Sequence, residues 1–246
     1  MSSPFSDVNP AGSHLGGVNV LFDLDGTLTD PFEGITACIQ YALHRLGAFC
    51  PPQTELAFCI GPPLLGSFAK LLANERADAA TPAEVEQAIA LYRERFSSIG
   101  LFENSLYAGI PELLSALRER GARLYVATSK PHVFARQIVE HFGLNEHFHA
   151  VHGSELDGTR SEKSEVIGWL LAAEGLAPDS CLMVGDRHHD IHGAARHGIP
   201  AVGVLWGYGS EDELQGAGAR AVCAAPPTLE RALVQLAGGL AGGRTR

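Results

Sequence analysis

The chain has 246 residues, a length that suits one large domain or one domain with an insert. Apolar residues make up 46% and charged residues 19%, as in soluble globular proteins with a sizeable core. The 28 Asp and Glu outnumber the 18 Lys and Arg, and the resulting formal charge of −10 argues against a general nucleic-acid binder.

The sequence shows no sign of a membrane span or of a secretory signal. Its longest apolar runs fall far short of the ~18 residues that a span needs. Residues 1–17 lack both a basic cluster and an apolar core of a signal peptide. The five cysteines show no CxxC spacing, and their odd number argues against a disulfide framework. We therefore expect a cytoplasmic protein.

The chain alternates between short apolar runs and helical patterns after an N-terminal segment without periodicity. Residues 1–16, rich in Ser, Pro and Gly, predict a flexible tail, as do the closing residues around Arg244 and Arg246. The apolar runs predict strands at 18–22, 123–127, 149–152, 181–184, 201–205 and 220–223, and the helical patterns lie at 111–120, 133–142, 162–174 and 191–197. This alternation predicts an α/β fold, a Rossmann-like parallel sheet with helices on both faces.

After the first strand the alternation stops, and only helical signals follow. The stretch Thr81–Glu84 is typical of a helix N-terminus, with Thr as N-cap, Pro at the first helical position and Glu in the first turn. A helical segment of ~70 residues is too long for a loop. We therefore expect an α/β core made of residues 17–33 and 108–246, and an all-helical cap made of residues 34–107.

Two clusters of acidic residues directly follow predicted strands. Asp23 and Asp25 belong to the stretch DLDGT after the first strand, and Asp186 and Asp190 follow the strand at 181–184. Ligands bind at the carboxyl ends of strands in open α/β sheets. A polar strand-to-turn junction would explain DLDGT alone, and a helix N-terminus would explain Asp190 alone, but neither explains two acidic clusters at strand ends. Four carboxylates at one edge would form a negative pocket that suits a hard cation such as Mg²⁺.

Two further features point to an anion near this edge. The strand at 123–127 ends in Thr128–Pro131, which offers hydroxyl and backbone N–H groups at a helix start. Lys163 lies in the first turn of a predicted helix, where the helix dipole favours acidic residues. We therefore infer that an anion, such as a phosphate or a carboxylate, binds this lysine. Ordinary solvated side chains are the alternative at both places. Trp169 and Trp206 fall beside no motif and are interpreted as packing residues.

In this order the four stretches resemble the motifs of the haloacid dehalogenase-like hydrolase superfamily. The pattern DxDGT matches Asp23–Thr27, the strand-ending Ser or Thr matches Thr128, the Lys matches Lys163, and GDxxxD matches Gly185–Asp190. The likeness extends from Val18 over nearly the whole remaining chain. The helical segment resembles the cap of phosphoglycolate phosphatase-like members.

The resemblance implies a Mg²⁺-dependent phosphatase that forms an aspartyl-phosphate intermediate. Asp23 would be the nucleophile, and Asp25 the general acid and then the general base. Thr128 and Lys163 would bind phosphoryl oxygens. The implied Mg²⁺ ligands are Asp23, the backbone carbonyl of Asp25, Asp186 and Asp190. Gly26, Thr27 and Ser129 are further expected substrate contacts. Arg160 is expected to add another because it lies three residues before Lys163, with an exposed arginine as the alternative.

The sequence leaves the substrate open among small phosphorylated metabolites. Phosphoglycolate is the first candidate, because the cap and motifs look most like that branch, and nucleoside monophosphates, as for a 5′-nucleotidase, are the second. A phosphomutase and a non-catalytic binding protein of the same fold are further alternatives, although the intact motifs argue against the latter. The stretch Ile60–Leu64 resembles a loop that reaches from the cap toward substrate, with an ordinary interhelical turn as the alternative. Either a monomer or a homodimer is compatible with the sequence.

Overall fold

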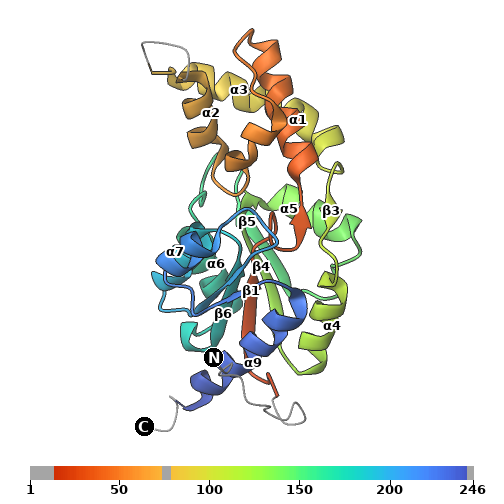
Figure 1. Ribbon diagram of the computed structural model, residues 1–246, viewed down its shortest axis with the longest axis vertical. Helices are drawn as coiled ribbons and strands as arrows, with labels where there is room; N and C mark the ends of the chain where they lie inside the picture. Colours follow the sequence, from red (N-terminus) through yellow and green to blue (C-terminus); the bar gives the residue numbers. More distant parts are fainter. Residues whose placement is uncertain (1–13, 74–78, 243–246) are drawn as a thin grey trace, which may run out of the picture.

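The structure, a computed structural model, describes residues 14–73 and 79–242, and Figure 1 shows its elements. In chain order these are β1 (Asn19–Phe22), β2 (Thr29–Asp30), α1 (Phe32–Arg45), η1 (Gln53–Glu55), η2 (Ala57–Cys59), α2 (Leu64–Ala73), α3 (Pro82–Arg95), η3 (Phe96–Gly100), β3 (Ser105–Leu106), α4 (Ile110–Glu119), β4 (Arg123–Pro131), α5 (His132–His141), β5 (Ala150–Ser154), α6 (Lys163–Glu174), η4 (Pro178–Ser180), β6 (Cys181–Gly185), α7 (His188–Ala195), β7 (Ala201–Val204), α8 (Glu211–Gly216), β8 (Ala221–Cys223) and α9 (Pro226–Gly242). None of the described helices combines the length and the apolar character of a membrane span.

Six strands of the described chain form one parallel sheet in the order β5-β4-β1-β6-β7-β8, which confirms the predicted Rossmann-like α/β fold. The first strand, β1, lies between β4 and β6, with Phe22 level with Val126 on one side and Val184 on the other. Later strands are therefore added toward both edges of the sheet, starting from β1. The carboxyl end of such a strand borders the crevice where open α/β sheets bind ligands.

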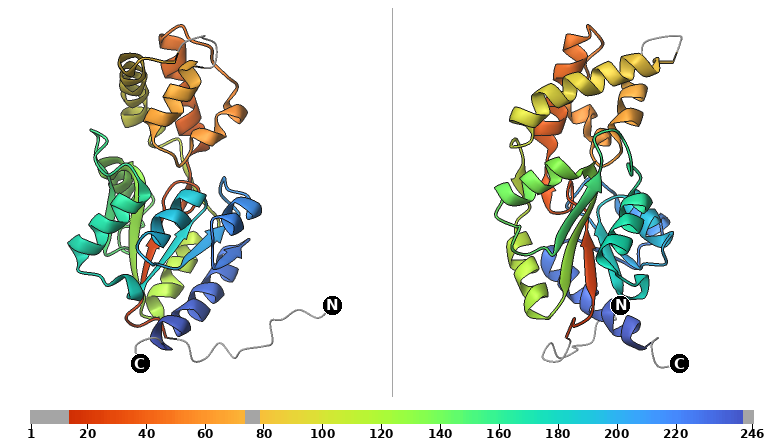
Figure 2. Two further views of the ribbon diagram at one scale, coloured as in Figure 1. Left: turned by 90° about the vertical axis from the view of Figure 1, so that its left-hand side faces the viewer. Right: turned by 180° about the vertical axis from the view of Figure 1, so that it is seen from behind.

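Different helices cover the two faces of the sheet, because side chains alternate along each strand. Val20 and Phe22 belong to the core that includes residues of α4, α5 and α9, whereas Leu21 packs with α6, α7 and α8. Figure 2 shows the sheet between these two layers. The two cores fix the strand register and with it the positions of the loops at the carboxyl edge.

The ordered core begins inside the segment that was predicted as a tail. Leu15 has no exposed surface, and its N–H donates to the carbonyl of Arg120 at 2.7 Å. Its apolar side chain joins the core, where burial stabilises it. The prediction of a loose tail up to residue 16 is therefore wrong at its end. The rest of that tail, residues 1–13, and the closing Arg244 and Arg246 lie outside the described residues.

The helices of residues 32–100, called the helical insert below, stand apart from the sheet in Figures 1 and 2. Its α3 helix begins as predicted, since the Thr81 hydroxyl accepts the N–H of Glu84 and the Glu84 carboxylate accepts the N–H of Thr81. Both ends of the insert pass through the antiparallel pair of β2 and β3, in which Thr29 lies opposite Leu106. This pair is absent from the sequence-based prediction, because two residues are too few to show a strand period.

Candidate active site

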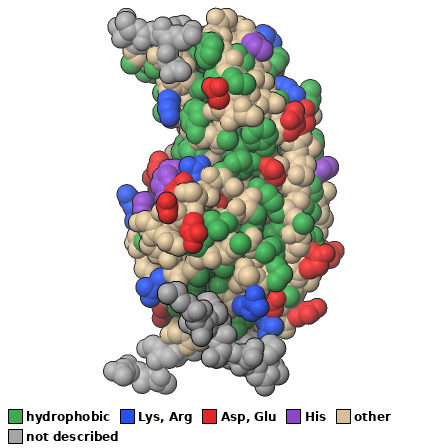
Figure 3. Space-filling view, in the orientation of Figure 1, with side chains coloured by type: hydrophobic (Ala, Val, Ile, Leu, Met, Phe, Trp, Pro, Cys, Tyr) green, Lys and Arg blue, Asp and Glu red, His purple; other side chains and the backbone are tan. Residues whose placement is uncertain are grey.

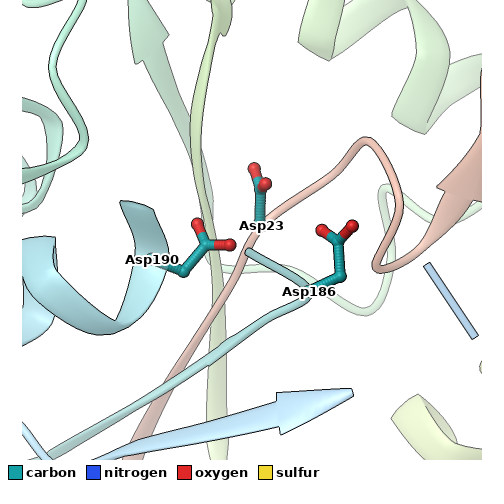
Figure 4. A group of neighbouring side chains, drawn as sticks. All are labelled: Asp23, Asp186 and Asp190. Atoms are coloured by element: carbon teal, nitrogen blue, oxygen red, sulfur yellow. The ribbon is translucent and has the colours of Figure 1, made fainter. Parts of the chain in front are cut away.

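Three carboxylates converge at the carboxyl edge of the sheet, as Figure 4 shows. Asp23 follows β1, Asp186 follows β6, and Asp190 lies in the first turn of α7. All three are buried, and one carboxylate oxygen from each lies within 4.8 Å of the others. Buried carboxylates at this spacing repel one another, so the group needs compensating positive charge.

Lys163 provides part of that charge from the first residue of α6. Its Nζ lies 2.7 Å from Oδ1 of Asp23, 2.8 Å from Oδ1 of Asp190 and 3.0 Å from the carbonyl oxygen of Ala127. Each of the three ammonium protons thus has an acceptor. Burial alone would lower the pKa of Lys163, but the contacts with Asp190 and Asp23 raise it above its usual value. Carboxylates of the site itself therefore hold this lysine at its unfavourable helical position.

Asp186 is oriented by donors from two loops. Its Oδ1 accepts the hydroxyl of Thr27 at 3.2 Å, and its Oδ2 accepts the N–H of Tyr208 at 2.8 Å. Thr27 was expected to contact substrate, but it is fully buried and turned to Asp186, so the geometry assigns it to positioning that carboxylate. Gly26 has a φ of 82°, and a Cβ there would lie 2.3 Å from Asp186 Oδ2. Glycine is therefore required at this turn.

The cluster has the donor set of a Mg²⁺ site. Burial, reinforced by the neighbouring carboxylates, raises the pKa of Asp186 well above its usual value and that of Asp190 to about 6. A divalent cation would relieve this repulsion, and converging carboxylate oxygens are the ligands that Mg²⁺ prefers. The residues present therefore fit a Mg²⁺ ion held by Asp23, Asp186 and Asp190.

Asp25 lies next to this cluster and has a cation of its own. Its Oδ2 lies 2.9 Å from Nζ of Lys130, and its Oδ1 is buried without a hydrogen-bond partner among the described residues. Burial raises the pKa of Asp25, and Lys130 opposes that shift only in part. A carboxyl group that retains its proton is suited to general acid catalysis.

Lys130 was missed by the sequence analysis, although a signal for it was present. It lies two residues after Thr128 in an extended segment, where such residues point to the same side. Thr128 is buried, and its hydroxyl accepts the N–H of Lys130 at 3.2 Å. The carbonyl of Ser129 accepts the hydroxyl of Ser154 at 2.8 Å. The extended TSKP segment thus brings three site residues to the edge.

Arg160 does not join the carboxylate cluster. Its guanidinium contacts Glu155 and lies 4.5 Å from the ring centroid of Trp169. Glu155 also contacts Nδ1 of His132 at 3.1 Å. The expected substrate contact of Arg160 is therefore replaced in this structure by an ion pair and a cation–π contact, and Trp169 is half exposed rather than a core packing residue.

The loop after β7 adds two contacts that the sequence analysis missed. Trp206, interpreted as a packing residue, donates its Nε1–H to the carbonyl of Thr27 at 3.0 Å. Tyr208, whose N–H binds Asp186, also donates its hydroxyl to Asp30 in β2. Because β7 is the parallel neighbour of β6, this loop lies beside Asp186. No motif in the sequence marks it.

A cavity of about 880 Å³ lies between the helical insert and the core. Asp25, Ser129 and Lys130 line it from the core, and residues 61–67 and the α3 helix line it from the insert. The molecule narrows on the left of Figure 3, where the insert meets the core. Arg187 of the core donates from Nη1 to the carbonyl of Ile60 at 3.2 Å, which ties the Ile60–Leu64 stretch to the site.

The haloacid dehalogenase-like hydrolase family matches residues 20–204, which include every one of these site residues except the Trp206 and Tyr208 loop. The chain belongs to the haloacid dehalogenase-like hydrolase family. The motif assignments of the sequence analysis led to the same family, and the match covers the helical insert and the sheet except for β8.

Two of three named relatives carry phosphatase names, and the third is named a kinase. A 5′-nucleotidase of Pseudomonas aeruginosa is 55% identical over 197 residues, covering 80% of this chain and 86% of the relative. The tyrosine-protein kinase PtkA of Mycobacterium tuberculosis is 43% identical over 193 residues, 78% of this chain but 64% of its own length. A phosphoglycolate phosphatase of Shigella boydii is 30% identical over 207 residues, which cover 77% of this chain and 81% of the relative.

A solved structure shares most of this architecture. A predicted phosphatase from Clostridium acetobutylicum superposes with a TM-score of 0.84 at 40% identity, covering 89% of this chain and 98% of the other. Family membership and the phosphatase relatives together identify this haloacid dehalogenase-like chain as a phosphoric monoester hydrolase.

Proposed function

We propose that this phosphatase depends on Mg²⁺ and hydrolyses small phosphomonoesters through a phosphorylated Asp23. The observation that carries the proposal is the convergence of Asp23, Asp186 and Asp190 on one point, with Lys163 in contact with two of them. Mg²⁺ held by these carboxylates and by the backbone carbonyl of Asp25 would offset the repulsion between an anionic phosphate and an anionic nucleophile.

The reaction divides into two transfers at phosphorus. In the first, a carboxylate oxygen of Asp23 bonds to phosphorus while the bond to the leaving oxygen breaks, and Asp25 donates its proton to that oxygen. In the second, Asp25 takes a proton from water, the water oxygen attacks phosphorus, and the Asp23–phosphorus bond breaks to release inorganic phosphate. Thr128 donates to a phosphoryl oxygen, and Lys163, whose protons contact Asp23, Asp190 and Ala127 in this structure, turns one of them to a phosphoryl oxygen when substrate binds. Negative charge concentrates on these oxygens in the transition state.

The helical insert acts as a cap in this proposal. Its inner surface forms one wall of the cavity in front of Asp25, so a substrate bound there lies between insert and core. Enclosure limits the water that reaches the phosphorylated Asp23 and strengthens the charge interactions of the site. The bond from Arg187 to the Ile60 carbonyl supports a direct connection between insert and motif.

Nucleoside monophosphates are the substrates that this site favours. The relative named 5′-nucleotidase is 55% identical to this chain, against 30% for the relative named phosphoglycolate phosphatase. The cavity of about 880 Å³ lies in the range of pockets that enclose drug-sized ligands. Its lining includes the aromatic rings of Phe58, Phe96 and Phe134, against which a nucleoside can pack.

Phosphoglycolate is the second candidate. The observation that favours it is the family branch, since relatives from two organisms carry the name phosphoglycolate phosphatase at 30% and 31% identity. A two-carbon ester would leave most of the cavity empty, which is why it ranks below the nucleotides.

Phosphate release from a panel of phosphorylated metabolites tests the proposal. We expect release that requires Mg²⁺, stops with EDTA, and is abolished in Asp23→Asn but not in Asp212→Asn, an exposed Asp on α8 that serves as the control. The kcat/KM values for nucleoside monophosphates should exceed that for phosphoglycolate. Release unaffected by Asp23→Asn in a folded protein would refute the mechanism, and a preference for phosphoglycolate would refute the substrate assignment.

A further inference from the structure

Arg93 lies on α3 of the helical insert and lines the cavity on the side opposite the core. Phe96, three residues further along the same helical segment, has its ring centroid 4.7 Å from Nζ of Lys130, which in turn contacts Asp25. Residues three apart lie on one side of a helix, about 5 Å from each other. Arg93 is therefore placed one helical turn beyond the residue that covers the reacting end of the cavity.

The guanidinium of Arg93 has no protein partner in the described part of the chain. Its Nε is buried without a hydrogen-bond acceptor among the described residues. The neighbouring arginines of the insert differ. Arg95 forms two bonds with Glu103, at 2.6 and 2.8 Å, and Arg45 contacts Glu94 and the Tyr41 hydroxyl.

The buried Nε–H of Arg93 is unfavourable without an acceptor, which a ligand in the cavity can supply. Burial lowers the pKa of Arg93, which shows that the cation has lost part of its hydration. Glu86 also lines the cavity from α3, but it lies seven residues earlier, about 10 Å along the helix. A partly desolvated guanidinium without acceptors costs free energy, and such local conflicts are expected at functional sites.

Most other charged groups that line the cavity are already engaged. Glu155 contacts Arg160 and His132, Asp25 contacts Lys130, and Asp157 accepts the N–H of Thr159 at 2.9 Å. Lys70 of α2 lies 4.4 Å from the ring centroid of Phe58. Arg93 is thus the half-buried cation of this lining whose donors remain available to a ligand.

We propose that Arg93 is a specificity-determining residue that binds the base of a nucleoside monophosphate through its keto edge. This inference rests on the proposed function. A guanidinium only donates hydrogen bonds, so it pairs with a carbonyl oxygen and an adjacent ring nitrogen, as on guanine or hypoxanthine, and gains nothing from an exocyclic amino group. The site should therefore prefer bases with an oxygen at the position where adenine carries its amino group.

Inosine and adenosine 5′-monophosphate test this preference, because they differ at that position. We expect the wild-type kcat/KM for IMP to exceed that for AMP by about tenfold to a hundredfold, the discrimination typical of a bidentate Arg contact. In Arg93→Met the ratio of kcat/KM for IMP to kcat/KM for AMP should fall to near one. The cause should be a higher KM for IMP, with kcat for AMP little changed. Arg93→Lys, which keeps the charge without the planar fork, should give an intermediate ratio.

Arg45→Met is the matched control, because Arg45 belongs to the insert but does not line the cavity. It should leave both kcat/KM values unchanged. Equal wild-type kcat/KM values for IMP and AMP would overturn the inference. A preference for IMP that persists in Arg93→Met would overturn it as well. Equal losses for IMP and AMP in both Arg93 variants would indicate a structural role and would also overturn it.

Binding separates this inference from the proposed function. In the Asp23→Asn background, calorimetry should show tighter binding of IMP than of AMP, with the difference lost when Arg93→Met is added. If the wild-type protein hydrolyses neither nucleotide but this binding pattern holds, the proposed reaction fails and the Arg93 assignment stands. If the protein hydrolyses both nucleotides but binds them equally, the proposed reaction stands and the Arg93 assignment fails.

Discussion

The core and the helical insert treat charge in opposite ways. On the core side, Lys163 is buried between Asp23 and Asp190, and Lys130 lies against Asp25, so opposite charges meet before any substrate arrives. On the insert side, Nε of Arg93 is buried without an acceptor among the described residues. Preorganised charge pairs are what a fixed reaction requires, whereas an uncompensated donor awaits a ligand. The difference supports the proposal that the core sets the chemistry and the insert selects the substrate.

Substituting Lys163 by Met tests the core side most severely. Without its ammonium group, the carboxylates of Asp23 and Asp190 lose their shared cation and the phosphoryl oxygens lose a donor. We expect kcat to fall about 100- to 1000-fold for every substrate, with no change in substrate ranking. Steady-state kinetics on the best and the poorest substrates measure both effects. A change in ranking would contradict the division between core and insert.

Lys130→Met tests the residue that connects the core and the insert. Lys130 contacts Asp25 in the core and the Phe96 ring of the insert. Because it contacts Asp25, the proposed general acid, its loss should lower kcat about 10- to 100-fold and change KM little. Lys130→Arg should restore part of kcat. An increase in KM at constant kcat would instead place Lys130 with the substrate-selecting insert.

The affinity for Mg²⁺ should increase with pH. Burial raises the pKa of Asp190 to about 6 and raises that of Asp186, so below these values a cation must displace protons in order to bind. From Asp190 alone, we expect the dissociation constant to be about fourfold lower at pH 8 than at pH 5.5. Calorimetric titration of the Asp25→Asn protein, which is expected to be inactive, measures it without turnover. Equal affinities at the two pH values would show that these carboxylates do not hold the ion.

Thr81→Ala should separate insert stability from chemistry. Thr81 and Glu84 form the capping box of α3, and its loss should lower the free energy of unfolding by about 1 kcal/mol. Urea denaturation measures this loss, and Ser210→Ala, at the N-cap of α8 in the core, is the comparison. The kcat of both variants should stay within about twofold of wild type, since neither touches the site. A lower kcat in Thr81→Ala alone would show that the end of α3 participates in turnover.

The sequence allowed the fold and the acidic centre to be predicted because both depend on local patterns. Asp23 follows an apolar run, and Asp186 follows another, and parallel pairing of β1 with β6 necessarily brings their ends together. Lys163 could be singled out because a lysine conflicts with the dipole at a helix start. These inferences needed only strand ends and a helix start, which short windows of sequence reveal.

The features that escaped prediction depend on contacts between distant segments. Lys130 is a site residue because the pairing of β4 with β5 shifts register after Ala127 and the strand continues to Pro131. The role of Tyr208 depends on the neighbour relation of β6 and β7 and on the position of Asp30. Arg160 was assigned to substrate from its distance to Lys163 in the sequence, which does not show that Glu155 competes for it.

The pairing of β2 with β3 gives the molecule a modular construction. Thr29 and Leu106 are neighbours across this pair, so the chain leaves the core and re-enters it at adjacent points. Paired strands lie about 5 Å apart, a gap that almost any compact insert can bridge. Insertions, deletions or wholesale replacement between these two residues would leave the order of the parallel strands untouched. Evolution, or an engineer, could therefore exchange one insert for another and give the same hydrolytic centre a new set of substrates.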